Sequence, residues 1–129
     1  MAAQLQATHD PGWYENLTFH LHLCARRLGL LDKADRYLAL QRPRRPEDEA
    51  FLAGQRCVLR VEQGRLEAAE AETPLFAERV IDPTLDADRD FALGRLREAQ
   101  GRTDEARALY RRGLAVCPRD EISLRLDAL

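Results

Sequence analysis

Lysine and serine are nearly absent from this chain of 129 residues. Lys33 is its only lysine, and Ser123 is its only serine. Its three cysteines, Cys24, Cys57 and Cys117, stand far apart and form no Cys-x-x-Cys pair. A disulfide framework, a zinc site and a serine or cysteine nucleophile with a supporting motif are therefore not expected. We expect the cysteines to be buried as small hydrophobic side chains in a reducing, cytoplasmic compartment.

An excess of one charge and long apolar runs are also missing. The formal net charge is -2, so no strong field favours nucleic acid or an anionic membrane. No apolar stretch is long enough to span a bilayer, and residues 1–9 lack the pattern of a secretory signal. No phosphate-binding loop or catalytic triad is present, and His20 and His22 diverge on a helix. We expect no catalysis, cofactor, metal, nucleic-acid partner or membrane insertion.

Glycine is infrequent, but it recurs in one pattern. The form Gly, any residue, Leu or Thr, acid, any residue, Ala begins at Gly29, Gly64 and Gly101, with spacings of 35 and 37 residues. A period in the mid-thirties is typical of helical hairpin repeats. Glycine tolerates the left-handed conformation that ends a helix, and an acid suits the start of the next one. The pattern therefore predicts three helix–turn–helix pairs.

Apolar residues at helical spacing flank these glycines. Before them, the predicted core stripes are Leu17, Leu21, Cys24 and Leu28; Ala50, Ala53, Cys57 and Val61; and Ala92, Leu93, Leu96 and Ala99. After them, the predicted stripes are Ala34, Leu38 and Gln41, and Ala106, Leu109, Tyr110, Gly113 and Leu114.

Prolines mark the expected boundaries. Asp10-Pro11 resembles the start of the first helix, and Thr84 or Asp86 is a candidate cap of a later one. Pro43 and Pro46, Pro83 and Pro118 are expected to close the three repeats. We predict a single domain over residues 1–129, with repeats over 12–46, 47–83 and 84–118 and a capping helix over 120–129.

Thr73-Pro74 interrupts the second repeat. Proline inside a helix removes a backbone hydrogen bond and clashes with the preceding turn, at a cost of roughly 3 kcal/mol. We predict a kink or a break there, followed by a short helix over residues 75–80.

The third repeat carries residues with a known spacing. Leu93-Gly94, Ala106, the aromatic Tyr110 and Pro118 follow one another as in the tetratricopeptide repeat, which this segment resembles. Asp90 and Arg97 replace the Trp and the Tyr of that pattern. The first repeat has His22 in place of Gly, and the second has Cys57 and Thr73 in place of Gly and the aromatic residue.

The resemblance implies an all-α fold, a right-handed superhelical stack of antiparallel helix pairs. Related hairpin solenoids and an irregular helical bundle are the alternatives. In tetratricopeptide arrays the first helix of each pair lines a concave groove. By position, that groove would present Asn16, Phe19, His20, Leu23, Arg27, Phe51, Gln55, Val58, Glu62, Asp88, Phe91, Arg95 and Glu98.

Four of these residues, Phe19, Leu23, Phe51 and Val58, lie off the predicted core stripes, and exposed apolar surface usually marks an interaction site. Alternatively, interior helices of a stack are buried on two sides and need both stripes. The groove predicts a non-catalytic adaptor or chaperone that holds a peptide or an amphipathic helix of another protein. The other hypothesis is a scaffold that self-associates, as a homodimer or as a piece of a longer helical-repeat protein.

Two further groups have two interpretations each. Trp13-Tyr14 either fills the end of the stack or seats a partner. Arg42, Arg44 and Arg45 form either a solvated loop between repeats or a contact for phosphate or an acidic partner.

Overall fold

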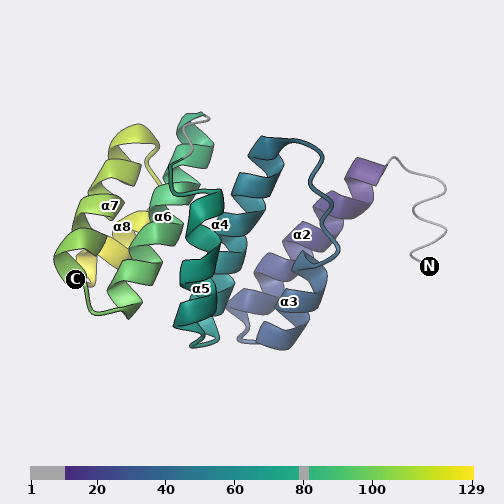
Figure 1. The fold of residues 1–129 in the computed structure, drawn as a ribbon, viewed down its shortest axis with the longest axis horizontal. Helices are drawn as coiled ribbons and strands as arrows, with labels where there is room; N and C mark the ends of the chain where they lie inside the picture. The colour runs from purple at the N-terminus through teal and green to yellow at the C-terminus, as the bar shows by residue number, and fades with distance from the viewer. Residues whose placement is uncertain (1–10, 79–81) are drawn as a thin grey trace. The chain divides into compact units, whose positions relative to one another are not determined.

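The computed structural model describes residues 11–78 and 82–129, with side chains described from Glu15 onward. Every regular element in these ranges is helical (Figure 1). The elements are α2 (Pro11–Arg27), α3 (Leu31–Leu38), α4 (Pro46–Glu62), α5 (Leu66–Glu72), the 3₁₀ turn η1 (Thr73–Leu75), α6 (Pro83–Ala99), α7 (Thr103–Val116) and α8 (Asp120–Asp127). The predicted all-α class is confirmed.

The chain divides into two compact units, one up to Pro43 and one from Arg44 onward. The first unit holds the α2–α3 hairpin, and the second holds α4 to α8. Each unit is described by itself below. The single domain and the right-handed stack of all three pairs stay predictions.

The three glycine turns are confirmed. Gly29, Gly64 and Gly101 have φ values of 76°, 74° and 79°, in the left-handed region. After each glycine, the next backbone N–H donates to the carbonyl five residues earlier, at 2.9 Å from Leu30, 2.8 Å from Arg65 and 2.8 Å from Arg102. This closure is the Schellman motif. The same turn therefore joins α2 to α3, α4 to α5 and α6 to α7.

The helix starts differ from the prediction at two prolines. Pro46 and Pro83 do not close repeats; they are the first residues of α4 and α6. Proline suits this position because the first helical N–H has no partner within the helix. Asp82, rather than Thr84 or Asp86, caps α6, because its carboxylate accepts the Leu85 N–H at 2.8 Å. Asp10 lies outside the described residues.

The buried face of α2 also differs from the predicted stripe. Thr18, His22 and Ala25 are buried, whereas Leu17 and Leu28 are exposed. The buried face is thus turned by one residue, about 100° around the helix.

Hydrogen bonds explain how a threonine can face the core of the first unit. The Gln41 side-chain amide donates to the Thr18 hydroxyl oxygen at 2.7 Å and to the Glu15 carbonyl oxygen at 2.8 Å. The Thr18 hydroxyl donates to the same carbonyl at 3.0 Å. Ala34 and Leu38 of α3 are buried as predicted.

The core of the second unit follows the predicted stripes more closely. Ala50, Ala53, Cys57 and Val61 of α4 are buried together with Ala92, Leu93 and Leu96 of α6. Ala99 was predicted to join them, but it is exposed at the end of α6. Ala106, Tyr110 and Gly113 of α7 are buried, and Leu109 and Leu114 are half-buried.

Pro74 ends α5 as predicted, but no helix follows over residues 75–78. Thr73–Leu75 form the 3₁₀ turn, and residues 76–78 form a hydrogen-bonded turn. This course buries Phe76 in the core cluster that also holds Ala69 and Cys57. Phe76 therefore supplies the aromatic side chain that Thr73 does not.

The predicted capping helix is confirmed as α8. Its Ile122 is fully buried in a cluster with Ala87, Ala106 and Tyr110. The half-buried Leu126 and Leu129 pack against the same cluster. This helix therefore covers the apolar end of the α6–α7 hairpin.

The cysteines were all predicted to be buried, and only Cys57 is fully so. Burial raises the pKa of its thiol to about 12, and the charges of Glu72 and Glu70 add to the effect. Cys117 is half-buried, and the prediction is wrong for Cys24, which is exposed. All three cysteines lie in the described part of the chain and are free thiols.

Candidate partner-binding face

Ion pairs between helices show that α4, α6 and α8 line one face of the second unit. Glu62 of α4 lies 3.7 Å from a guanidinium nitrogen of Arg95 on α6. One helical turn further along α6, Glu98 accepts hydrogen bonds from Arg125 of α8. We call the surface around these two pairs, with Phe51, Asp88 and Phe91, the α4–α6–α8 face.

The α6–α7 hairpin is built on a small residue facing a large one. A Cβ atom added to Gly94 would lie 2.7 Å from Cδ1 of Tyr110, closer than real side chains approach. The absence of that atom lets the buried Tyr110 ring lie against the α6 backbone. Its hydroxyl donates to Glu98 at 2.9 Å, and burial, followed by this bond, raises the pKa of the phenol.

Gly94, the alanine of the next helix and its aromatic residue thus lie together as the sequence pattern predicts. Residues 87–128 match the model of the tetratricopeptide repeat family. This segment is therefore similar to a tetratricopeptide repeat. No curated protein and no solved structure matches the chain.

The same segment departs from the family pattern at Asp90, which stands in place of Trp. The Asp90 side chain is 0% exposed. Its carboxylate accepts two hydrogen bonds from Arg112 of α7, at 2.6 and 3.1 Å, and a third from Arg89 at 3.1 Å. A buried carboxylate needs such partners. A forked ion pair therefore joins α6 to α7 where the family pattern has an indole ring.

The predicted site residues of the second unit lie at different depths. Phe51, Gln55, Phe91 and Arg95 are half-buried. Val58 is only 2% exposed and belongs to the core cluster. The position of Val58 therefore agrees with the alternative interpretation, in which an interior helix is buried on two sides. Phe91 packs against the Tyr110 ring, with the centroids 6.3 Å apart.

The site residues of the first unit all lie on α2. Asn16, His20 and Arg27 are exposed, whereas Phe19 and Leu23 are half-buried. The Phe19 ring lies 5.3 Å from the His22 ring and 6.2 Å from the His20 ring, measured between centroids. The side chains of Trp13 and Tyr14 lie outside the described residues.

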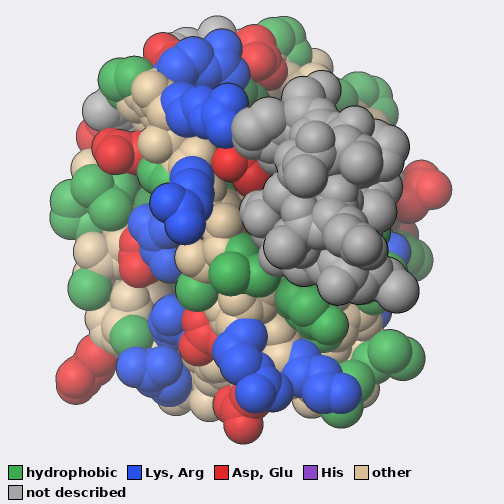
Figure 2. Space-filling model, turned by 90° about the vertical axis from the view of Figure 1, so that its right-hand side faces the viewer, with side chains coloured by type: hydrophobic (Ala, Val, Ile, Leu, Met, Phe, Trp, Pro, Cys, Tyr) green, Lys and Arg blue, Asp and Glu red, His purple; other side chains and the backbone are tan. Residues whose placement is uncertain are grey.

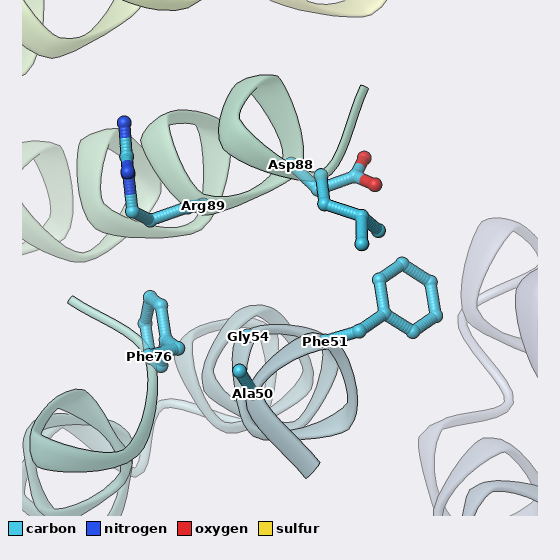
Figure 3. Close-up of a pocket in the computed structure, with 7 residues that line it drawn as sticks. Ala50, Phe51, Gly54, Phe76, Asp88 and Arg89 are labelled. Atoms are coloured by element: carbon cyan, nitrogen blue, oxygen red, sulfur yellow. The ribbon is translucent and has the colours of Figure 1, made fainter. Parts of the chain in front are cut away.

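A small hollow opens in the second unit at the part of the α4–α6–α8 face that holds Phe51 and Asp88 (Figure 3). Its lining residues are Ala50, Phe51, Gly54, Phe76, Leu85, Asp88 and Arg89. In Figure 3, α4 contributes the floor, and Asp88 and Arg89 come from α6 across it. Sequence reasoning missed Phe76 and Leu85. The sequence did contain a signal for Phe76. Helix α5 has no aromatic residue, and Phe76 is the first aromatic residue after it.

Asp88 joins the hollow to α8. Its carboxylate pairs with Arg119, which also donates to the Thr84 carbonyl at 3.1 Å. Burial raises the pKa of Asp88, and the charge of Arg119 opposes this effect. The charges on this part of the face are therefore paired across helices.

The three arginines before α4 lie in a loop exposed to solvent, which agrees with the first of their two interpretations. Arg42, Arg44 and Arg45 are all exposed. The Arg45 backbone N–H donates to Asp48 at 3.1 Å, and its guanidinium pairs with the same carboxylate. This interaction fixes the start of α4.

Metal-binding clusters and membrane-spanning helices are both absent from the described residues. They contain no group of three or more His, Cys, Asp or Glu side chains placed to hold a metal ion. None of their helices is long and apolar enough to cross a membrane. Figure 2 shows Lys and Arg side chains spread among acidic and hydrophobic ones on one side of the molecule.

Proposed function

We propose that this chain is a non-catalytic interaction module that holds a peptide or an amphipathic helix of another protein on the α4–α6–α8 face. Tetratricopeptide repeats generally mediate interactions between proteins. Within that general role, the details of this face favour one class of partner.

The hollow beside Phe51 is the observation that carries the proposal. Phe51, Phe76 and Leu85 give it apolar walls. The charged residues nearby already pair with each other, as Glu62 does with Arg95 and Glu98 with Arg125. Binding energy must then come mainly from an apolar side chain that enters the hollow, as in a helix-in-groove complex.

The remaining predicted residues are assigned to the same function. Asn16, Phe19, His20, Leu23 and Arg27 would give the first unit a partner-binding surface of its own on α2. Gln55, Phe91 and Arg95 would contact the partner in the second unit, and Val58 would support them from the core. We propose an adaptor or chaperone role in the cytoplasm, where free thiols such as Cys24 persist.

A truncation of Phe51 tests this proposal. The probe is a helical peptide selected against the unchanged chain from a displayed library, and its affinity is measured by fluorescence anisotropy. We expect Phe51→Ala to raise the dissociation constant by about tenfold or more, as for the central residue of an interface. Val116→Ala removes an exposed apolar side chain from the end of α7 and should leave the affinity unchanged.

Equal affinity of the peptide for Phe51→Ala and for the unchanged chain would contradict the assignment. Circular dichroism must show that both variants keep their helical content. Val58→Asp is not a useful test, because a charge in the core cluster would unfold the second unit whether or not a partner binds there.

A further inference from the structure

The two most exposed large apolar side chains of the described residues lie in different units. Leu28, at the end of α2, is 74% exposed, and Leu124 of α8 is 69% exposed. Neither belongs to the α4–α6–α8 face or to the hollow. Exposed apolar side chains that gather on one surface, unlike single ones, mark an interaction site.

Leu28 belongs to an apolar strip on α2. Leu17, Cys24 and Leu28 are exposed and fall at helical spacing on one side of the helix. His20 and Arg27 are exposed beside them. We call these five residues the head surface.

The repetition within the chain shows what normally covers such a strip. Leu96 precedes the turn glycine Gly101 by the same number of residues as Cys24 precedes Gly29. Leu96 is fully buried in the cluster that α4 shares with α6. The strip on α2 therefore corresponds to the side of α6 that packs against a neighbouring helix.

Leu124 lies on an acidic strip of α8. Asp120, Glu121 and Asp127 are exposed, and each lies three or four residues from Leu124, so all four share one side of the helix. We call these four residues the tail surface. The head surface presents a leucine beside an arginine, and the tail surface presents a leucine between acids.

We propose that the head surface of one copy binds the tail surface of a second copy. Leu28 and Leu124 would become buried together, with Arg27 facing the acids of α8. Such a head-to-tail contact joins two different surfaces, so a pair of copies still has one free head and one free tail for further copies. Because the attraction includes exposed charges, the association weakens as salt rises.

Two single variants and their mixture test this proposal. Leu28→Asp disrupts the head surface, and Leu124→Asp disrupts the tail surface. Both side chains are mostly in water, so circular dichroism should show unchanged folding. Sedimentation equilibrium over a range of concentrations should give an increasing mass for the unchanged chain and a monomer for each variant, with association weakened by about thirtyfold or more.

The equimolar mixture gives the sharpest outcome. The intact tail of Leu28→Asp should bind the intact head of Leu124→Asp, which yields a two-chain species and nothing larger. Leu75→Asp, an exposed site outside both surfaces, should behave like the unchanged chain.

Three results would overturn the proposal: a chain that stays monomeric at every concentration, a Leu124→Asp variant that still self-associates, or a mixture that stays monomeric. None of these results bears on peptide binding at Phe51.

Discussion

Gly94 and Tyr110 show how a single absent methyl group holds the third hairpin together. The Tyr110 ring occupies the space that any larger residue at position 94 would need. We expect Gly94→Ala to lower the free energy of unfolding by about 2 kcal/mol, because overpacking forces the ring or the helix to move. Urea unfolding followed by circular dichroism measures the change.

Gly54 provides the matched control on α4. A Cβ atom there would meet its nearest neighbours, Ala92 and Phe76, at the ordinary distance of 3.8 Å. Gly54→Ala should therefore keep or slightly raise stability, since alanine favours the helix by about 0.5–1 kcal/mol. Equal losses at positions 54 and 94 would show that the close approach of Tyr110 is not the cause.

His22 is a second residue whose surroundings set a measurable property. Its ring is buried, and neither nitrogen has a hydrogen-bonding partner of good geometry among the described residues. Burial, with a contribution from the charge of Arg26, lowers the pKa of His22 to about 4, although the Phe19 carbonyl opposes the shift. The folded chain thus keeps this ring neutral.

The pH dependence of stability follows from that shift. Because the unfolded state binds the proton more readily, stability is full above about pH 6.5 and declines as pH falls toward 4, by up to about 3 kcal/mol. Urea unfolding measured at several pH values in this range should show that the free energy of unfolding of His22→Leu lacks this decline. The exposed His20 is the control, and His20→Leu should retain the decline. A decline of the same size in His22→Leu would contradict the assignment to His22.

The burial of His22 and Thr18 also shows what the sequence of α2 could not reveal. The apolar spacing of Leu17, Cys24 and Leu28 predicted the wrong side of the helix as core. Thr18 can face inward because Gln41, 23 residues away, satisfies its hydroxyl. Such a distant partner has no signature in local periodicity.

At the scale of elements, the end of α5 shows how a disruption can be compensated. Pro74 stops the helix, and the 3₁₀ turn carries Phe76 into the core cluster. We expect Phe76→Ala to destabilise the second unit by about 3–5 kcal/mol, as for a fully buried phenylalanine. Leu75→Ala, at an exposed neighbouring position, should cost less than about 0.5 kcal/mol.

Urea unfolding of both variants would check this, and a small loss in Phe76→Ala would show that Phe76 does not replace the missing aromatic residue. The break at Pro74 could be predicted from the cost of proline in a helix. The sequence signalled an aromatic residue after the break, but the inward turn of Phe76 depends on its contact with α4 near Gly54, which exists only in the assembled hairpin.

The other elements were predictable to differing degrees. The glycine period gave the three hairpins, since Gly29, Gly64 and Gly101 each needed a left-handed turn. The prediction for two prolines was wrong, because Pro46 and Pro83 begin helices instead of ending repeats. A proline near a boundary fits both roles, and only the cap, such as Asp82, distinguishes them.

For the whole molecule, charge pairing between helices limits what the chain can bind. Arginines from α6, α7 and α8 pair with Glu62, Asp90 and Glu98. These pairs could not be predicted from the sequence, because they depend on which helices become neighbours. Partner binding stays a prediction, and the paired charges narrow our proposal to the apolar hollow as the main source of binding energy.

The central claim is that α4, α6 and α8 carry the partner-binding surface of the second unit. Its most direct test is the pattern of NMR chemical-shift changes in the unchanged chain when the selected helical peptide is added. We predict the largest changes at Phe51, Leu85, Phe91 and Arg95, and little change at Glu67, Ala108 and Arg111 on the second helices. The largest changes on α5 and α7 instead would contradict the claim.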